Sequence, residues 1–330
     1  MNSIWFNVLF LIVGLILVIK GGDYFVSSAV SLAKRTKIPS VVIGATIVSV
    51  ATTLPEILVS VIASINGQFD MAVGNGVGTI IANIAFICGI SVSLLPMMVK
   101  RTSNIKYFIL LFLNLFLVIC GLNGKIDLYE AIILVVAFVF FIIVNIIEAK
   151  KESKRYPQEE DDDITELKEI MPWKVIIPLF IIGALSIGFG AMTLVKTGSF
   201  LASKIGISEE IIGLTIIALG TSLPELVTAI ISIRKKESAL GYGNIIGANI
   251  INFSLLIGLS GIISGSNGLP ITKQTSLISL PLSLFVTLIF TLPLIFTSKT
   301  YRWQGVILLL SYLIYIVFLI MTTLQVVVVK

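Results

Sequence analysis

The stretch that decides the fold is IGATIVSVATTLPE at residues 43–56, because it recurs as IGLTIIALGTSLPE at residues 212–225. The two copies align without a gap, so that position 43 corresponds to 212 and position 56 to 225. Each copy places one carboxylate, Glu56 or Glu225, inside an otherwise apolar run. Duplicated segments that carry acids within a hydrophobic chain are typical of an ion pathway at the interface between two repeats.

The rest of the chain is also strongly apolar. Hydrophobic residues make up 57% of the sequence and charged residues 12%, whereas a soluble domain carries about 25% charged residues. Runs such as residues 128–147 are long enough to span a bilayer. The composition therefore predicts an integral membrane protein with the lipid bilayer as its partner and no nucleic acid. There is no histidine, which excludes an imidazole metal site, and Cys88 and Cys120 lie in apolar runs typical of core positions.

One long polar stretch, residues 149–172 with the acidic run Glu159–Asp163, divides the chain into two halves. We predict a first transmembrane repeat at 1–148, an acidic cytoplasmic linker at 149–172 and a second transmembrane repeat at 173–330. Each half contains five apolar segments of spanning length. The ten predicted spans lie at about 4–20, 38–65, 71–97, 105–122, 128–148, 173–195, 207–233, 240–264, 275–297 and 303–328.

The distribution of basic residues predicts the orientation. With the N-terminus outside, 18 of the 23 lysines and arginines fall in inside loops. The positive-inside rule therefore places both termini outside the cell membrane and the linker in the cytoplasm. An odd number of spans per repeat means that the two repeats are inserted with opposite orientation, as two inverted five-helix repeats.

Of the 18 acidic residues, only Glu56 and Glu225 sit deep in predicted spans. A charge at the bilayer centre costs about 2.5–3.5 kcal/mol on insertion scales, and no basic residue is placed to compensate it. A bound cation is the natural partner. The alternative is a pair of protonated, hydrogen-bonded glutamates, which the oxygen-bearing neighbours of both acids disfavour.

Those neighbours are hydroxyls and a proline in both copies: Thr52, Thr53 and Pro55 in the first, Thr221, Ser222 and Pro224 in the second. Proline donates no N–H and clashes with the carbonyl four residues earlier, so it is expected to break the helix there. The carbonyls around 49–52 and 218–221 would then face a cavity, where irregular backbone is tolerated at membrane depth. We therefore predict an all-α integral membrane fold of ten transmembrane helices, with broken helices at a central ion site.

A second duplicated pair, GNGVGTIIAN at 74–83 and GNIIGANIIN at 243–252, keeps the offset of the first pair. Its glycines are spaced four apart, which permits close helix approach, and its asparagines Asn83 and Asn252 offer neutral oxygens to the centre. Carboxylates, hydroxyls, amides and carbonyls form an all-oxygen ligand set. Calcium takes six to eight such ligands, several sodium ions could share them, and magnesium is less well served.

These residues resemble the two alpha repeats, at about 42–84 and 211–253, of the sodium/calcium exchanger family in the calcium/cation antiporter superfamily, of the prokaryotic calcium/sodium antiporter type. The resemblance implies a transporter without cofactor or enzymatic activity. It implies that calcium is exported by alternating access in exchange for sodium, and no obligate protein partner is evident. The implied calcium ligands are the carboxylates of Glu56 and Glu225 with the carbonyls of Thr52 and Thr221. The implied sodium ligands come from Ser49, Thr52, Thr53, Glu56 and Thr79 on one side and Ala218, Thr221, Ser222 and Glu225 on the other. Asn83 and Asn252 would line the middle.

The sequence departs from the family pattern at three positions. Ala51 replaces a glycine, Ala248 stands where a hydroxyl is usual, and Asn252 stands where many relatives carry aspartate. Since potassium-dependent relatives carry an acid at that position, Asn252 argues against potassium co-transport. A proton-driven calcium/cation antiporter is the alternative within transport. A passive channel is disfavoured by the lack of an acid ring or filter repeat, and a membrane hydrolase by the lack of a nucleophile–base pair.

Overall fold

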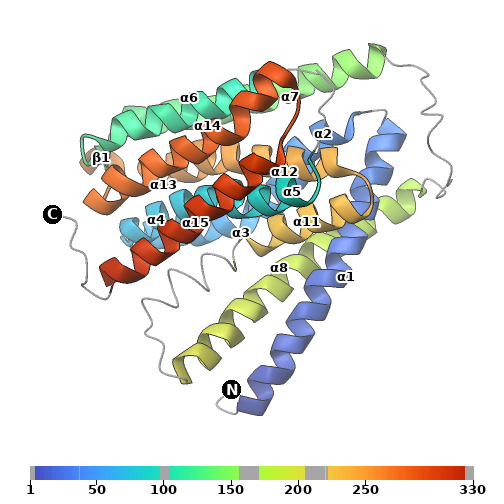
Figure 1. Cartoon of the computed structure of the whole chain (residues 1–330), viewed down its shortest axis with the longest axis horizontal. Helices are drawn as coiled ribbons and strands as arrows, with labels where there is room; N and C mark the ends of the chain where they lie inside the picture. Colours follow the sequence, from blue (N-terminus) through green and yellow to red (C-terminus); the bar gives the residue numbers. More distant parts are fainter. Residues whose placement is uncertain are drawn as a thin grey trace.

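The computed structural model describes residues 4–36, 38–96, 104–155, 171–204, 220 and 222–323. Apart from two short strands, the described chain is helical (Figure 1). Its first half contains α1 (Ile4–Thr36), α2 (Ser40–Ile43), the π-helical turn η1 (Gly44–Val48), α3 (Ser49–Ile65), α4 (Phe69–Ile81), the π-helical segment η2 (Ala82–Cys88), α5 (Gly89–Leu94), α6 (Ile105–Gly121), β1 (Lys125–Ile126) and α7 (Leu128–Arg155). Its second half contains α8 (Trp173–Lys204), α11 (Leu223–Arg234), α12 (Ser238–Ile251), the π-helical turn η4 (Asn252–Leu256), α13 (Ile257–Ser264), the 3₁₀ turn η5 (Gly265–Asn267), β2 (Leu269–Pro270), the π-helical turn η6 (Thr275–Ser279), α14 (Leu280–Thr297) and α15 (Arg302–Thr323).

Eight continuous helical stretches of the described chain are long and apolar enough to cross a membrane. They are Ile4–Thr36, Ser40–Ile65, Phe69–Leu94, Leu128–Lys151, Trp173–Gly198, Ser238–Asn267, Thr275–Thr297 and Arg302–Thr322. The fourth predicted span contains the shorter apolar helix α6, and α11 is the described part of the seventh. Large apolar side chains such as Trp5, Phe296 and Ile314 face outward, as in a surface that contacts lipid. The predicted all-α architecture with many apolar spans is confirmed.

Helices α1 and α8 lie side by side along one flank of the molecule (Figure 1). They begin at Ile4 and Trp173, which correspond at the offset of the duplicated motifs, as do Gly14 with Gly183 and Gly21 with Gly190. These glycines let the two backbones touch. A Cβ at Gly14 would meet the carbonyl oxygen of Gly190, and a Cβ at Gly21 would meet that of Gly183. Each glycine therefore contacts the counterpart of the other, which is the reciprocal pattern of a twofold contact.

Two further contacts join the halves of the chain. Strands β1 and β2 pair antiparallel, with Lys125 opposite Pro270 and Ile126 opposite Leu269. Deeper in the bundle, the Asn114 side chain of α6 donates a hydrogen bond to Thr287 Oγ1 of α14 at 2.9 Å and accepts one from Ser283 Oγ at 2.9 Å. All three side chains are fully buried, so this polar link fixes the register of α6 against α14.

The expected helix break at Pro55 is wrong. Helix α3 continues through Pro55 to Ile65, and the π-helical turn η1 precedes it directly. Pro55 frees the carbonyl oxygen of Ala51, four residues earlier, and such a group is tolerated in a transmembrane helix whose surroundings satisfy it. In the second copy, α11 begins at Leu223 with Pro224 in its first turn, where proline is tolerated.

Two helices extend beyond the predicted spans. The prediction ends the first span near residue 20, but α1 continues to Thr36. Helix α7 continues from the fifth predicted span into the predicted linker, as far as Arg155. Lysine, arginine and glutamate are good helix formers, so residues 149–155 lower the local hydropathy without interrupting α7. The acidic run 159–163 lies outside the described residues.

Candidate ion-binding site

The two predicted membrane carboxylates are buried together. Glu56 lies in α3 and Glu225 in the first turn of α11, and both side chains are 0% exposed. The two carboxylates lie close enough for their charges to interact. None of their four oxygens accepts a hydrogen bond of standard geometry from a described residue, although the Thr52 and Thr53 hydroxyls lie beside Glu225. A buried carboxylate without a counter-ion is costly, so this pair requires a partner that the described residues do not supply.

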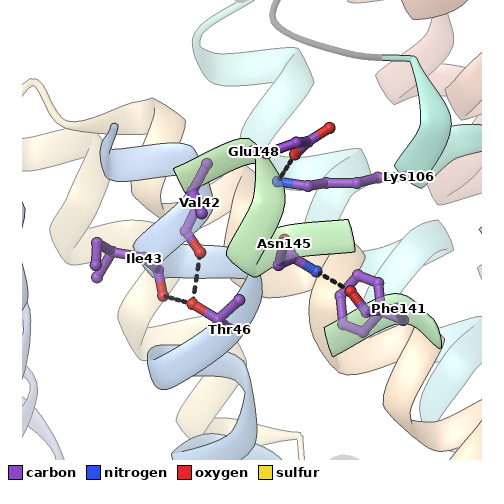
Figure 2. Close-up of polar contacts among 7 residues, drawn as sticks. All are labelled: Val42, Ile43, Thr46, Lys106, Phe141, Asn145 and Glu148. Carbon is purple, nitrogen blue, oxygen red and sulfur yellow. Dashed lines mark hydrogen bonds and ion pairs between the residues drawn. The ribbon is translucent and has the colours of Figure 1, made fainter. Parts of the chain in front are cut away.

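Another carboxylate near the end of a predicted span shows the contrast. Glu148 of α7 pairs with Lys106 of α6, with 3.0 Å between Oε2 and Nζ (Figure 2). Their side chains are only 12% and 7% exposed, so this ion pair is largely shielded from solvent. Nearby, Asn145 Nδ2 donates to the carbonyl oxygen of Phe141 at 2.8 Å. Here the chain provides its own cation. At Glu56 and Glu225 it provides none among the described residues.

The hydroxyls that precede Glu56 have hydrogen-bond acceptors other than the two glutamates. Ser49 Oγ donates to the carbonyl oxygen of Thr46 at 3.0 Å. Thr53 Oγ1 donates to the carbonyl oxygen of Ser49 at 2.6 Å, and Thr52 Oγ1 donates to Asn244 Oδ1 at 3.1 Å. Both threonine hydroxyls lie beside the Glu225 carboxylate. Because their protons have other acceptors, their oxygen lone pairs are available to a cation.

The remaining predicted ligands in the described chain have no partner at all. They are four buried side chains, each at most 2% exposed and without a hydrogen bond to its polar atoms: Thr79, Asn83, Ser222 and Asn252. Asn252 is the first residue of η4, and Asn83 the second of η2. Short π-helical segments of this kind occur often at functional sites. Buried polar groups are normally paired, so unpaired ones at four of the predicted ligand positions indicate a ligand.

Close helix packing brings the halves of the site together. Helix α12 packs against η1 and α3, and η4 packs against α3 and α4. At Gly247 a Cβ would collide with Ser49 Oγ and with the backbone of Ala45, so only glycine permits this approach. Ala248, next to it, is fully buried. The predicted ligands Ala218 and Thr221 lie outside the described residues.

A pair of asparagines at the site is absent from the predicted ligand set. Asn244 accepts the hydrogen bond from Thr52, and Asn75 donates to Ser60 Oγ at 2.9 Å and to the carbonyl oxygen of Glu56 at 3.3 Å. The signal is present in the sequence, because each asparagine directly follows the first glycine of its copy of the second duplicated motif. The sequence interpretation assigns a polar role in this motif only to Asn83 and Asn252.

The ligand chemistry of the site is limited to oxygen. Within the described residues, no three aspartate, glutamate, cysteine or histidine side chains gather into a metal-binding cluster. The site can therefore offer a cation two carboxylates together with neutral hydroxyl, amide and carbonyl oxygens. Hard cations such as calcium and sodium accept this set, whereas soft transition metals prefer sulfur or imidazole. Cys88 and Cys120 are buried free thiols that pack in the hydrophobic core.

Comparisons with known proteins agree with this chemistry. A family model described as sodium/calcium exchanger protein matches residues 6–147 and 175–321. The sodium/calcium exchanger MaX1 of Methanosarcina acetivorans is 31% identical over 357 residues, which cover 95% of this chain and 98% of that protein. The putative antiporter CaxA of Alkalimonas amylolytica is 35% identical over 266 residues, which cover 78% and 80% of the two chains.

Solved structures show the same fold. The sodium-calcium exchanger NCX_Mj, soaked with 2.5 mM sodium and 10 mM strontium, superposes with a TM-score of 0.82. The match covers 96% of this chain and 99% of that one at 26% sequence identity. The similarity therefore extends over both halves of the molecule and is not confined to the duplicated motifs.

Proposed function

Since the chain belongs to the sodium/calcium exchanger family, we propose that it exports calcium across the cell membrane by alternating access, driven by the sodium gradient. One observation carries the proposal. Two buried carboxylates lie together with no protein cation among the described residues, and four further side chains with unpartnered oxygens are buried at the predicted ligand positions. A transported divalent cation supplies the missing positive charge and the missing coordination.

We assign the calcium site to the carboxylates of Glu56 and Glu225, with the backbone carbonyls of Thr52 and Thr221. The flanking sodium sites use two sets of residues. One set is Ser49, Thr52, Thr53, Glu56 and Thr79, and the other is Ala218, Thr221, Ser222 and Glu225. Asn83 and Asn252 line the centre with neutral amides. Because both cations need the same two carboxylates, their occupancies compete, and this competition couples the two fluxes.

The proposed architecture is ten helices in two inverted repeats, with both termini outside and the linker in the cytoplasm. The common offset of the duplicated motifs supports it, because the helices keep that offset as well: α4 and α12 begin at Phe69 and Ser238, as α1 and α8 begin at Ile4 and Trp173. The reciprocal glycine contacts between α1 and α8 fit a twofold axis in the membrane plane. Two such halves around one site provide the symmetry that alternating access requires.

Calcium-45 flux into proteoliposomes tests the proposal, with sodium, potassium and pH gradients imposed separately. Calcium should accumulate only when sodium runs out of the vesicles. Accumulation driven by a pH gradient alone would instead identify a proton-coupled antiporter. Flux that ignores all three gradients would identify a passive channel.

A further inference from the structure

The hydrogen bond between Thr52 and Asn244 suggests a role for a residue outside the predicted ligand set. Thr52 Oγ1 carries one proton and lies beside the Glu225 carboxylate, but its two acceptors of standard hydrogen-bond geometry are Asn244 Oδ1 at 3.1 Å and the carbonyl oxygen of Ser49 at 3.3 Å. The Ser49 carbonyl also accepts the Thr53 hydroxyl at 2.6 Å. Asn244 is therefore the nearer acceptor for the Thr52 proton and the less heavily used one.

The direction of that proton matters because Thr52 lies beside the Glu225 carboxylate. If the hydroxyl donated to Glu225, its hydrogen would occupy a carboxylate lone pair and place positive charge where a cation must bind. With the proton held by Asn244, the Thr52 oxygen turns its lone pairs toward the carboxylate side. In the structure neither Glu225 oxygen accepts a hydrogen bond of standard geometry from a described residue.

The two repeats differ in what surrounds this asparagine. Its counterpart Asn75 donates to Ser60 of its own repeat at 2.9 Å. The position equivalent to Ser60 in the second repeat is Ala229, which has no hydroxyl. Asn244 Nδ2 accordingly has no partner among the described residues, while Oδ1 reaches across the repeat interface to Thr52. Asn244 is fully buried, so water does not compete for this contact.

We infer that Asn244 is a positioning residue for cation binding, which holds the Thr52 hydroxyl proton away from Glu225 so that the Thr52 oxygen can coordinate sodium. The inference rests on the proposed function, since it assumes that Thr52 is a sodium ligand. Asn244 itself does not touch the ion. It acts through Thr52, and the test must separate that action from a general effect on packing.

The test measures how sodium stabilises the purified protein in detergent. The midpoint temperature of thermal unfolding is measured at increasing sodium concentrations, and choline replaces sodium so that the ionic strength stays constant. A ligand that binds the folded state raises the midpoint with its concentration. Asn244→Leu should raise the half-saturating sodium concentration about two- to tenfold, as expected for one lost hydrogen bond. Asn244→Asp keeps the acceptor and should bind sodium no more weakly than wild type. If the leucine variant does not fold, Asn244→Ala removes the same acceptor without added bulk.

A double-mutant cycle tests whether Asn244 acts through the Thr52 hydroxyl. Once Thr52→Val has removed the hydroxyl, Asn244→Leu should cause no further loss of sodium affinity, because the residue acts only through that group. Asn75→Leu is the matched control: this twin amide does not contact Thr52, so its effect should be unchanged in the Thr52→Val background.

The outcomes are distinguishable. An unchanged half-saturating concentration in the Asn244 variants, or an additive loss in the double mutant, would overturn the inference while leaving the proposed function intact. A wild-type protein that shows no stabilisation by sodium would overturn both.

Discussion

At the scale of single residues, the site is distinguished by polar atoms that the chain leaves unpaired. Some buried hydroxyls elsewhere in the core are satisfied locally, as where Thr291 Oγ1 donates to the carbonyl oxygen of Thr287 at 2.7 Å. At the site, Thr79 Oγ1 and both polar atoms of Asn83 have no partner among the described residues. Such atoms lower stability in the absence of a ligand, so their presence points to a function.

The Thr79→Val variant tests whether the unpartnered Thr79 hydroxyl is a sodium ligand. The methyl group replaces an unpartnered hydroxyl, so the thermal midpoint without sodium should stay equal or rise. The half-saturating sodium concentration for calcium flux should rise about tenfold, because a ligand is lost. Thr291→Val is the control, and its sodium dependence should match that of wild type. A Thr79→Val protein with wild-type sodium dependence would remove Thr79 from the sodium site.

A second prediction concerns Asn252. Aspartate at this position would add a third carboxyl beside Glu56 and Glu225, and like charges at close range do not all ionise easily. The new acid should therefore hold a proton, which mimics the shape and the donor of the asparagine amide. Asn252→Asp should retain calcium exchange and gain a pH dependence in its flux. Loss of flux at every pH would contradict this account of the centre.

Much of the site could be predicted from the sequence because duplication marks it. The glutamates, their hydroxyl neighbours and the two central asparagines all repeat at one offset. Asn244 could not be assigned in this way, because its role depends on what does not repeat. Its amide oxygen contacts Thr52 across the repeat interface, and such a contact leaves no trace in either repeat alone.

At the scale of elements, the helix pair α1 and α8 depends on glycine. A Cβ at Gly190 would lie 2.7 Å from Val18 Cγ2 and 2.8 Å from the carbonyl oxygen of Gly14, which is too close for either atom. Backbone cannot yield as a flexible side chain can, so the two helices would have to separate. The pair therefore packs through backbone contact rather than through large interdigitating side chains.

Gly190→Ala should lower the thermal midpoint in detergent, by an amount that corresponds to about 1–3 kcal/mol of overpacking. Gly188→Ala is the matched control on the same helix, because a Cβ there meets no described atom within 4 Å. It should leave the midpoint unchanged or raise it, since alanine favours a helix over glycine. Equal midpoints for the two variants would show that the close contact does not hold the helices together.

Two features of the helices and strands could not be predicted from the sequence. Apolar runs located the helices, but the proline rule did not predict the shape of α3. Pro55 would break a helix in water, whereas α3 continues through it to Ile65. The strand pair between Lys125–Ile126 and Leu269–Pro270 was also missed, because two-residue strands carry no periodic signal.

At the scale of the whole molecule, the asymmetry of basic residues predicts the orientation in the membrane. A cysteine at Ser153, near the end of α7, should be cytoplasmic and should resist an impermeant thiol reagent in intact cells. The background would lack Cys88 and Cys120, which are the two native cysteines. A cysteine at Asn123, exposed between α6 and β1, should label readily as the matched control. Labelling in the reverse pattern would invert the topology.

The central claim is that two buried glutamates, one from each repeat, jointly hold the transported calcium. Sodium-driven calcium-45 uptake into proteoliposomes tests it most directly when Glu225→Gln is compared with wild type at equal reconstitution. Glutamine keeps the size of the side chain and removes one of the two negative charges that a divalent ion requires. The account predicts a folded, monodisperse variant whose uptake falls to the level of empty liposomes. Wild-type uptake by that variant would contradict the site, and with it the mechanism proposed for this chain.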